Sequence, residues 1–284
     1  MTDAVGPSVE RMPGRREATR SALIEADGLA IEYEKARDRS RLLALWDFTL
    51  TVPEGEFLVI VGPSGCGKTT FLSAVAGLVA PTSGTVRFEG APVRGPGPDR
   101  AMVFQDYALM PWRTVEKNVR FGLEMAGSRA RQHTDDVRRY IELVGLAGFE
   151  KSYPHELSGG MRQRVGLARA LVVDPKVMLM DEPFAAVDAM TREIMQGELE
   201  RIIHETGKTV VFVTHSIDEA LTLADRIAVI TSRPGRLREV IEVDLPRPRY
   251  EKDVKASPRY QELREHVWSL LQKEVSQNLR SGVE

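Results

Sequence analysis

Residues 57–69 read FLVIVGPSGCGKT, and this stretch decides the fold class of the chain. The first five residues are all apolar, which is typical of a fully buried strand. The next eight fit the pattern G-x-x-x-x-G-K-[ST], and residues 69–78, TTFLSAVAGL, have a helical pattern. A glycine-rich turn between a buried strand and a helix presents backbone N–H groups beside the positive end of the helix. The stretch therefore predicts a loop that binds phosphate groups.

The chemistry of the loop residues indicates a nucleoside triphosphate with its Mg²⁺ ion. Lys68 supplies a positive charge for the β- and γ-phosphate oxygens, and Thr69 offers a hydroxyl ligand to Mg²⁺. The alternative is a glycine-rich turn in which Lys and Thr occur by coincidence, and the strand–loop–helix context disfavours it. The nucleotide-binding residues expected here are Gly62, Pro63, Ser64, Gly65, Cys66, Gly67, Lys68, Thr69 and Thr70.

Composition narrows the class of protein. The chain has 284 residues, with 39 Lys and Arg against 41 Asp and Glu, so its formal net charge is −2. This balance excludes the strongly basic surface of a typical nucleic-acid-binding protein. The apolar runs, such as residues 57–61, are much shorter than the roughly 20 residues of a membrane span. Cys66 is the only cysteine, so an intramolecular disulfide is excluded and a reducing, cytoplasmic compartment is expected.

Strand-like and helix-like stretches alternate along the chain, which predicts an α/β fold. A mainly helical insert at about 107–170 interrupts this alternation. We expect a mobile tail at 1–20, a domain at 21–240 and a C-terminal extension at 241–284. Apolar residues at helical spacing between 263 and 279 predict an amphipathic helix that packs on the core, and its mixed polar face disfavours a membrane-surface helix. Strands are predicted at 22–33, 43–52, 84–89, 101–105, 177–180, 210–214 and 227–231, and helices at 115–144, 159–173, 194–206 and 217–224.

Two acids follow the strand predicted at 177–180. Asp181 and Glu182 come directly after four apolar residues, so the strand places both carboxylates at the carboxyl edge of the sheet, where open α/β sheets bind ligands. Asp181 is expected in the Mg²⁺ shell. Glu182 points elsewhere and is expected to polarise the attacking water. A pair of surface acids is the alternative, and the phosphate-binding loop upstream disfavours it.

A second glycine-containing motif, Leu157-Ser-Gly-Gly160, lies between these two elements and is followed by Met161. Ser158 and two glycines at the start of a helix form a second anion-binding N-terminus, with an ordinary N-cap as the alternative. Its position adds specificity, because Ser158 lies 23 residues before Asp181. At this point the sequence resembles the ABC-type ATPase family, whose signature reads LSGGQ.

The resemblance implies a fold, an activity and its ligands. The family fold is a P-loop NTPase (RecA-like) core with an antiparallel β subdomain and an inserted helical subdomain, and the activity is hydrolysis of ATP with Mg²⁺. Two copies form a head-to-tail homodimer, in which the loop of one copy and Ser158, Gly159 and Gly160 of the other hold each ATP. Four further residues match the family. Tyr33 would stack on adenine unless it is an ordinary core or surface tyrosine, and Gln105 would touch Mg²⁺ and the attacking water. The segment 185–188, which ends at Asp188, would cross to the other copy, and His215 would contact the γ-phosphate.

Shorter stretches away from these motifs indicate one branch of the family. Met161, together with residues 109–112 (LMPW), 232–236 (SRPGR) and 245–249 (LPRPR), resembles the branch that powers uptake of nitrate, sulfonates, taurine and related small solutes. These stretches are not expected to touch ATP. The branch works with multi-span membrane permease subunits and, indirectly, with an external solute-binding protein. We therefore expect a peripheral protein on the cytoplasmic face of the inner membrane, which binds no nucleic acid.

The sequence departs from the family pattern at positions that are not phosphate ligands. Met161 replaces the usual Gln, residues 185–187 read AAV where GAL is commoner, and Ser216 replaces the usual Asp. None of these changes removes a residue expected to hold the phosphates.

Trp112 and the functional class leave alternatives open. In the family, the region of residues 107–113 receives a short cytoplasmic helix from the membrane subunit. We hypothesise that Trp112 lines that groove, with burial in the core of the insert as the alternative. A soluble ABC-type ATPase acting on a non-transport partner, such as DNA or ribosomes, is a second class; the 53 residues between Gln105 and Ser158 leave no room for a long coiled coil. A GTPase is a third class, disfavoured because the chain contains no Asn-Lys-x-Asp motif.

Overall fold

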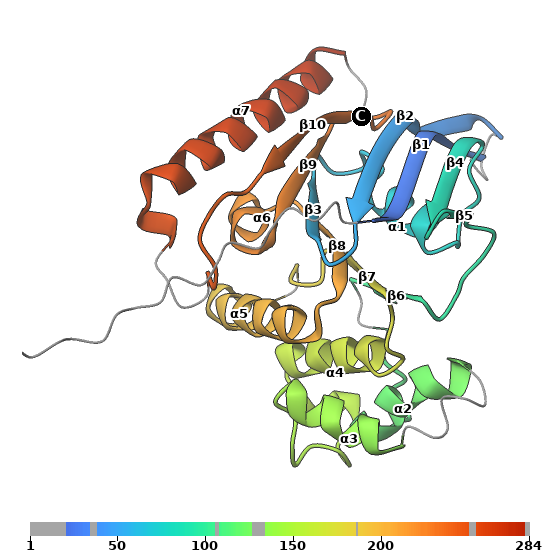
Figure 1. Cartoon of the computed structure of the whole chain (residues 1–284), viewed down its shortest axis with the longest axis vertical. Coiled ribbons are helices and arrows are strands. Elements are labelled where there is room, and N and C mark those ends of the chain that lie inside the picture. The colour runs from blue at the N-terminus through green and yellow to red at the C-terminus, as the bar shows by residue number, and fades with distance from the viewer. Residues whose placement is uncertain are drawn as a thin grey trace, which may run out of the picture.

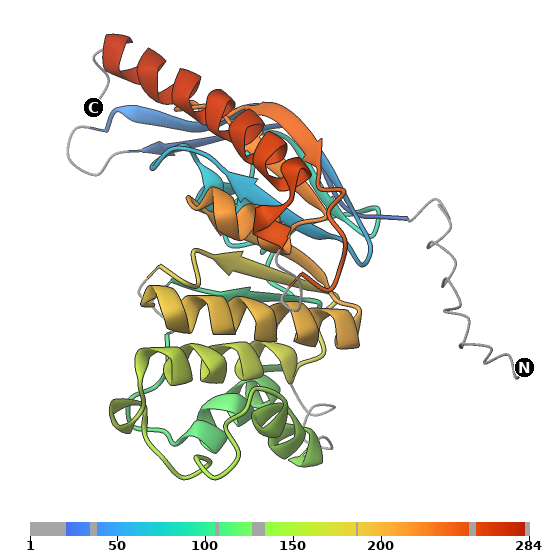
Figure 2. The same ribbon diagram turned by 90° about the vertical axis from the view of Figure 1, so that its left-hand side faces the viewer.

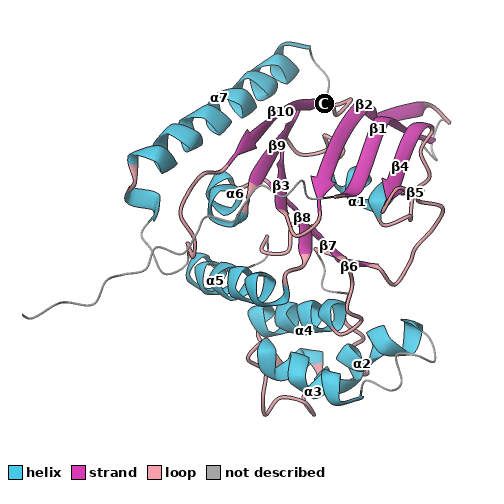
Figure 3. Ribbon diagram, viewed as in Figure 1, coloured by secondary structure: helices cyan, strands magenta, loops and turns pink. Residues whose placement is uncertain are grey.

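Two β-sheets and a group of helices make up the chain in the computed structural model (Figure 1). Strands gather in the centre and upper part of the view, with helices around and below them (Figure 3). The tail predicted at 1–20 lies outside the described residues. The structure describes residues 21–34, 39–105, 108–126, 134–185, 187–249 and 254–281.

The central sheet has six strands in the order β10-β9-β3-β8-β7-β6. Neighbouring strands are parallel except β10, which is antiparallel to β9. All residues of β3, β7 and β8 are buried, because layers of structure cover both faces of the sheet, and this explains their continuous apolar sequences. The strands are β3 (Phe57–Val61), β6 (Arg100–Val103), β7 (Val177–Asp181), β8 (Thr209–Thr214), β9 (Arg226–Ile230) and β10 (Leu237–Glu242).

The second sheet is antiparallel, in the order β2-β1-β4-β5. Helix α1 (Lys68–Val75) packs between the two sheets, and the ring centroid of its Phe71 lies 4.9 Å from that of Phe48 in β2. The side chains of β3 alternate between two cores: Leu58 and Ile60 join this layer, whereas Val59 joins the helices on the other face. The strands are β1 (Ala22–Glu34), β2 (Arg41–Pro53), β4 (Ser83–Phe88) and β5 (Ala91–Pro92).

Helices inserted between β6 and β7 form one end of the molecule (Figure 2). The continuous helix predicted at 115–144 is in fact two helices, α2 (Val115–Ala126) and α3 (Thr134–Leu143). Both pack on α4 (Gly159–Leu171), and a 3₁₀ turn at Pro154–Glu156 precedes α4. The insert thus places α4, which begins directly after Ser158, below the central sheet in Figure 1.

The remaining helices follow the central strands. Helix α5 (Ala189–Thr206) begins at Ala189 rather than at 194 because the Asp188 side chain caps it, accepting a hydrogen bond from the Thr191 N–H at 3.0 Å. Helix α6 (Ile217–Leu223) follows β8. Helix α7 (Pro258–Ser281) runs along the side of the molecule away from the insert (Figure 2).

The C-terminal stretch is part of the folded core. Helix α7 contacts α6 and β9, and its Tyr260, Leu263 and Val267 are buried, which confirms that it packs back on the core. Strand β10 runs across the boundary expected at residue 240, so the extension contributes residues to the central sheet. None of the described helices is long and apolar enough to cross a membrane.

Candidate functional site

Three parallel strands end at one edge of the central sheet and bring predicted site residues together. Val61 of β3 pairs with Thr214 of β8, and Asp181 of β7 pairs with Val213 of β8. The phosphate-binding loop follows Val61, and His215 follows Thr214. Because parallel strands share one direction, their carboxyl ends meet at the same edge, where open α/β sheets bind ligands.

The backbone of the loop from Gly62 to Thr69 suits an anion. Gly67 has a φ of 99°, and a Cβ atom there would lie 2.8 Å from the carbonyl oxygen of Ala44, so this position requires glycine. Gly67 is also the N-cap of α1, and no described side chain caps that helix. The first N–H groups of α1 are therefore available to an anionic ligand.

Lys68 is a buried cation held by neutral groups. Its Nζ donates hydrogen bonds to the carbonyl oxygens of Gly62 at 2.8 Å and Pro63 at 3.0 Å. None of the ion pairs within the described ranges includes Lys68. A buried ammonium group gains electrostatic energy when an anion joins it, so this side chain favours a phosphate beside the loop.

Thr69 and Asp181 meet at this edge although 112 positions separate them in the sequence. The Thr69 hydroxyl donates to Asp181 Oδ1 at 3.0 Å. Burial, with a smaller contribution from the neighbouring Glu182 charge, raises the pKa of the Asp181 carboxyl. A hydroxyl and a carboxylate whose charge is costly in isolation form a donor set that suits Mg²⁺, which takes oxygen ligands. In the described part of the chain, no group of three His, Cys, Asp or Glu side chains could hold a metal ion.

Glu182 and His215 form a second pair at the same edge. Glu182 has a φ of 43°, an uncommon backbone conformation for glutamate, and its N–H donates to the Val213 carbonyl at 3.0 Å. Its Oε2 lies 3.2 Å from His215 Nδ1. The glutamate is thus fixed by the backbone on one side and by an imidazole on the other. Such local strain occurs at functional sites, where the surrounding structure holds it.

The Ser158 motif lies away from the phosphate-binding loop. Ser158 caps α4, accepting a hydrogen bond from the Met161 N–H at 3.2 Å. Gly160 is buried against α5, where a Cβ atom would lie 3.0 Å from Thr191 Cγ2, whereas Gly159 faces open space. Figure 1 shows α4 below the central sheet and α1 beside β1, so the two anion-binding elements of one chain lie apart. Asp188 is exposed, and the hydrogen bond from the Thr191 N–H lowers its pKa; Ala186 of the same segment lies outside the described residues.

Comparison with known proteins places these elements in one family. A family model described as "ABC transporter" matches residues 45–185. An uncharacterised ABC transporter ATP-binding protein from Methanocaldococcus jannaschii is 52% identical over 241 residues, covering 85% of this chain and 89% of that protein. The chain belongs to the ABC transporter family. It is an ABC-type ATPase with the P-loop NTPase fold expected from the sequence.

Two further comparisons refine the family assignment. The taurine import ATP-binding protein TauB from Pseudomonas entomophila is 45% identical over 251 residues, covering 87% of this chain and 95% of that protein. A dimeric ATP-binding cassette in a post-hydrolysis state, bound to ADP and Pi, has a TM-score of 0.68 and 30% identity, covering 78% of this chain and 98% of that one. The resemblance to the branch that includes taurine importers is thereby confirmed.

Of the two further predicted site residues, Tyr33 lies beside the phosphate-binding loop, whereas Gln105 makes no hydrogen bond with the proposed Mg²⁺ ligands among the described residues. The Tyr33 hydroxyl lies 3.4 Å from Thr70 Oγ1, so the ring, 37% exposed, stands at the start of α1. Gln105 is exposed and lies two residues beyond the last residue of β6, not within a strand as predicted. No hydrogen bond in the described part of the chain joins Gln105 to Thr69 or Asp181. The structure brings Tyr33 to the loop but leaves the expected Mg²⁺ contact of Gln105 as a prediction.

The sequence interpretation missed Asn118, which shapes the surface around Trp112. Asn118 is fully buried; its Oδ1 accepts from the Met110 N–H at 2.9 Å, and its Nδ2 donates to the Arg113 carbonyl at 2.9 Å. The turn held in this way presents Trp112 with 73% of its surface exposed, so the core position considered for Trp112 is wrong. Asn118 lies beside Val115 and Val119 on the buried face of α2, and an amide on an apolar helical face is the signal that could have revealed it. Tyr107 of the same stretch lies outside the described residues.

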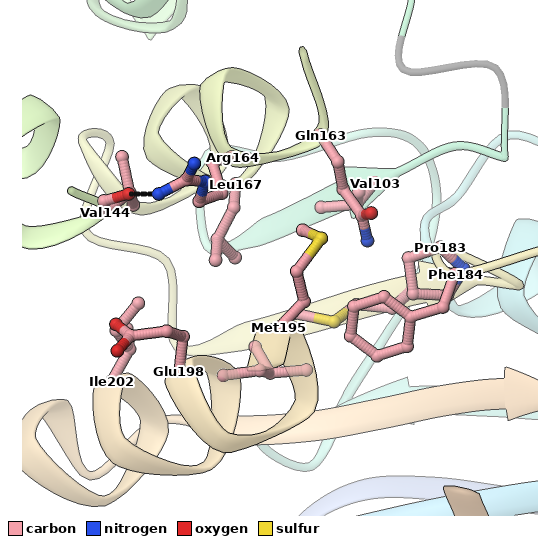
Figure 4. Close-up of a pocket in the computed structure, with 12 residues that line it drawn as sticks. Val103, Val144, Gln163, Arg164, Leu167, Pro183, Phe184, Met195, Glu198 and Ile202 are labelled. Carbon is pink, nitrogen blue, oxygen red and sulfur yellow. Dashed lines mark hydrogen bonds between the residues drawn. The ribbon is translucent and has the colours of Figure 1, made fainter. Parts of the chain in front are cut away.

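A mostly apolar pocket marks the joint between the helical insert and the core (Figure 4). Leu167 of α4 lies opposite Met195 and Ile202 of α5, and Phe184, which closely follows Glu182, closes one end. Gln163 is buried in its wall, and its Oε1 has no hydrogen-bond partner among the described residues. This loosely filled joint lies between the helix that begins at Ser158 and the segment that carries Glu182.

Proposed function

We propose that this ABC ATPase hydrolyses ATP in a head-to-tail homodimer and that the resulting motion drives import of a small solute through separate membrane subunits. One observation carries the proposal: the phosphate-binding loop, the Thr69–Asp181 pair and the Glu182–His215 pair meet at one sheet edge, while the Ser158 helix start stands apart. The described residues of one chain thus gather at one side of a nucleotide, and the Ser158 helix start does not reach that site.

The phosphates bind to the loop and to Lys68. The backbone N–H groups of residues 64–70 surround the phosphate oxygens, and the uncapped N-terminus of α1 adds its positive end. Lys68 leaves the carbonyls of Gly62 and Pro63 and pairs with the β- and γ-phosphate oxygens. Tyr33, which stands beside Thr70, stacks on the adenine ring. The glycines of the loop matter because they let the backbone approach the phosphates closely.

Thr69 and Asp181 would hold Mg²⁺, with Gln105 reaching it when the site closes. When bound, Mg²⁺ neutralises the negative charge that builds up on the phosphate oxygens. The raised pKa of Asp181 agrees with this role, because a nearby cation restores the ionised form that burial disfavours.

Glu182 polarises the attacking water, and His215 holds the Glu182 side chain in place. The 3.2 Å contact between the two side chains fixes the direction of the Glu182 carboxylate. An imidazole at the edge of the phosphate site can also donate to the γ-phosphate, which places His215 between the base and the group being transferred. Proton acceptance by a positioned carboxylate contributes about 10²–10⁴-fold to a rate of this kind.

A second copy would supply the missing half of the site. At the start of α4, Ser158 is exposed and no atom crowds the half-buried Gly159, which suits the far side of the γ-phosphate. Asp188 is exposed at the start of α5, and it belongs to the segment 185–188 that would cross between copies. The similarity to a dimeric cassette bound to ADP and Pi supports this arrangement.

The turn around Trp112 is the proposed contact with a multi-span permease. An exposed tryptophan on a turn fixed by a buried side chain is a preorganised aromatic anchor of the kind that dominates protein interfaces. A peripheral position on the cytoplasmic face of the inner membrane follows, with an external solute-binding protein acting only indirectly. Similarity to a taurine import protein supports a small solute such as taurine, another sulfonate or nitrate.

Glu182→Gln tests the ATP-dependent dimer. Glutamine has nearly the same shape as glutamate but no charge, and it cannot accept the proton of water. Hydrolysis should therefore fall at least about 100-fold. Size-exclusion chromatography with ATP and Mg²⁺ should then show a dimer that the wild-type chain forms only transiently. A Glu182→Gln variant that hydrolyses ATP at the normal rate would refute the role of Glu182.

Trp112→Ala tests the membrane partner, with Trp268→Ala on α7 as a matched exposed control (58% exposed). The chain is co-expressed with a multi-span permease subunit encoded in the same genome, and the two are co-purified in detergent. We expect Trp112→Ala to reduce the co-purified permease while its ATP affinity and the control stay normal. Normal recovery of the permease with Trp112→Ala contradicts the assigned surface. If even the wild-type chain recovers no permease, the alternative of a soluble ABC-type ATPase with a non-transport partner is favoured.

A further inference from the structure

The loop at residues 231–236, which follows β9, lies directly against the phosphate-binding loop. Gly235 donates its N–H to the Ala44 carbonyl at 2.9 Å and accepts from the Trp46 N–H at 3.0 Å. A Cβ atom on Gly235 would lie 2.0 Å from the Cys66 carbonyl oxygen. Only glycine permits this approach. A stretch that no sequence motif connects with ATP therefore touches the loop proposed to bind it.

Arg233 makes the polar contact between the two loops. Its Nε donates to the Gly65 carbonyl oxygen at 3.1 Å, and its Nη2 donates to the same oxygen at 2.9 Å. Gly65 has a φ of 72°, so its peptide could turn in several ways if nothing held it. The guanidinium group therefore selects one orientation of the peptide that joins Gly65 to Cys66.

Peptide geometry links that carbonyl to the phosphate side of the loop. In a planar trans peptide the carbonyl oxygen and the following N–H point in opposite directions. While Arg233 holds the Gly65 carbonyl outward, the Cys66 N–H points into the loop, where it now makes only a long bond of 3.4 Å to the Pro63 carbonyl. A bond of that length is readily exchanged for one to a phosphate oxygen.

Helix α7 supports the loop that carries Arg233. Glu274 of α7 is buried, and its Oε2 accepts from the Ser232 N–H at 3.2 Å and from the Ser232 hydroxyl at 3.4 Å. Ser232 directly precedes Arg233, so the buried carboxylate fixes the base from which the guanidinium reaches Gly65. The C-terminal helix is thereby connected to the phosphate-binding loop through two consecutive residues.

We propose that Arg233 is a positioning residue for ATP binding, which orients the Gly65–Cys66 peptide of the phosphate-binding loop and is itself supported from α7 by Glu274. Arg233 acts through the loop and not by contact with ATP. The inference rests on the proposed role of residues 62–70 in binding the phosphates.

Steady-state ATPase kinetics of the full chain test the inference. We expect Arg233→Ala to raise the KM for ATP about fivefold, or about 1 kcal/mol because 1.4 kcal/mol corresponds to tenfold, with kcat nearly unchanged. Arg233→Lys keeps one donor group and should raise KM by about twofold. Arg238→Ala, which removes an exposed arginine on β10, is the matched control and should leave KM unchanged. A KM for Arg233→Ala equal to that of the control overturns the inference.

Two further variants separate the possible failures. Glu274→Ala should raise the KM for ATP, as Arg233→Ala does. An unchanged KM would show that Glu274 of α7 does not support Arg233. Lys68→Ala should abolish ATP binding; if it binds ATP like the wild-type chain, the proposed phosphate site itself is wrong. Should Arg233→Ala lower the thermal midpoint, Arg233→Lys compared with Arg238→Lys decides the question, and equal KM values for these two overturn the inference.

Discussion

Replacing Asn118 by alanine should destabilise the chain through the turn that carries Trp112. The amide makes four hydrogen bonds, but two of its acceptors keep another partner: the Met110 carbonyl accepts from the Arg113 N–H, and the Thr114 carbonyl accepts from the backbone N–H at position 118. The groups left unpaired are the Met110 N–H and the Arg113 carbonyl. A buried group without a partner costs about 1–3 kcal/mol, and both groups here are only partly buried. We therefore expect Asn118→Ala to lower the free energy of unfolding by about 2–4 kcal/mol, the lower part of the summed range.

Urea denaturation followed by circular dichroism measures this loss. Asn118→Asp is the matched variant: when protonated, its carboxyl keeps an oxygen that accepts from Met110 and has one O–H group that can donate to the Arg113 carbonyl. At a pH low enough to protonate it, its loss of stability should therefore be smaller than that of Asn118→Ala. Co-purification with the permease should fall with Asn118→Ala, while the KM for ATP stays normal because the turn lies outside the nucleotide site. A loss below about 0.5 kcal/mol, the range of an ordinary surface substitution, would refute the reasoning.

Three further predictions concern the nucleotide site and its support. Burial, with the Glu182 charge, raises the pKa of Asp181, so the ionised carboxylate destabilises the folded chain at neutral pH. This penalty fades as the pH falls through the raised pKa. Asp181→Asn should therefore raise the free energy of unfolding at pH 7 by about 1 kcal/mol, with no gain near pH 3, and it should abolish Mg²⁺-dependent hydrolysis. Gly67→Ala should abolish ATP binding measured by calorimetry, because the new Cβ atom would meet the Ala44 carbonyl at 2.8 Å; normal affinity would contradict the close approach. Arg249→Ala should lower the free energy of unfolding by about 3 kcal/mol or more in urea denaturation, because the buried guanidinium donates to five backbone carbonyls at the end of α6 and beyond β10. A loss typical of surface positions would show that water replaces it.

Local patterns in the sequence were sufficient for most of the fold. The buried strands β3, β7 and β8 are continuous apolar runs because both of their faces are covered, and such runs are visible without a structure. The limits of α5 were not visible in the apolar pattern, since its first turn is exposed and the helix begins at the cap of Asp188. Strand β10 was missed for a related reason: it lies at the edge of the sheet, where mostly half-exposed residues give no clear alternation.

Some residues of the candidate site could be predicted from the sequence, and others could not. Lys68, Thr69, Asp181 and Glu182 lie in motifs whose spacing carries their chemistry, so their roles could be proposed from the sequence. Asn118 and Arg233 lie in no such motif. Their significance comes from backbone groups that are distant in sequence, and hydrogen bonds to distant backbone leave no periodic pattern.

The sequence by itself determined the class of the chain, its phosphate-binding loop and the order of its motifs, because a strand, a glycine-rich turn and a helix N-terminus act locally. Only the tertiary structure decided which side chains meet. Parallel pairing of β3, β8 and β7 in register brings Thr69 to Asp181 and Glu182 to His215, and the return of the chain after β9 brings Arg233 to Gly65. The physical reason is that contacts across a parallel sheet depend on strand order and register, which are set by burial of the whole core and not by any one segment.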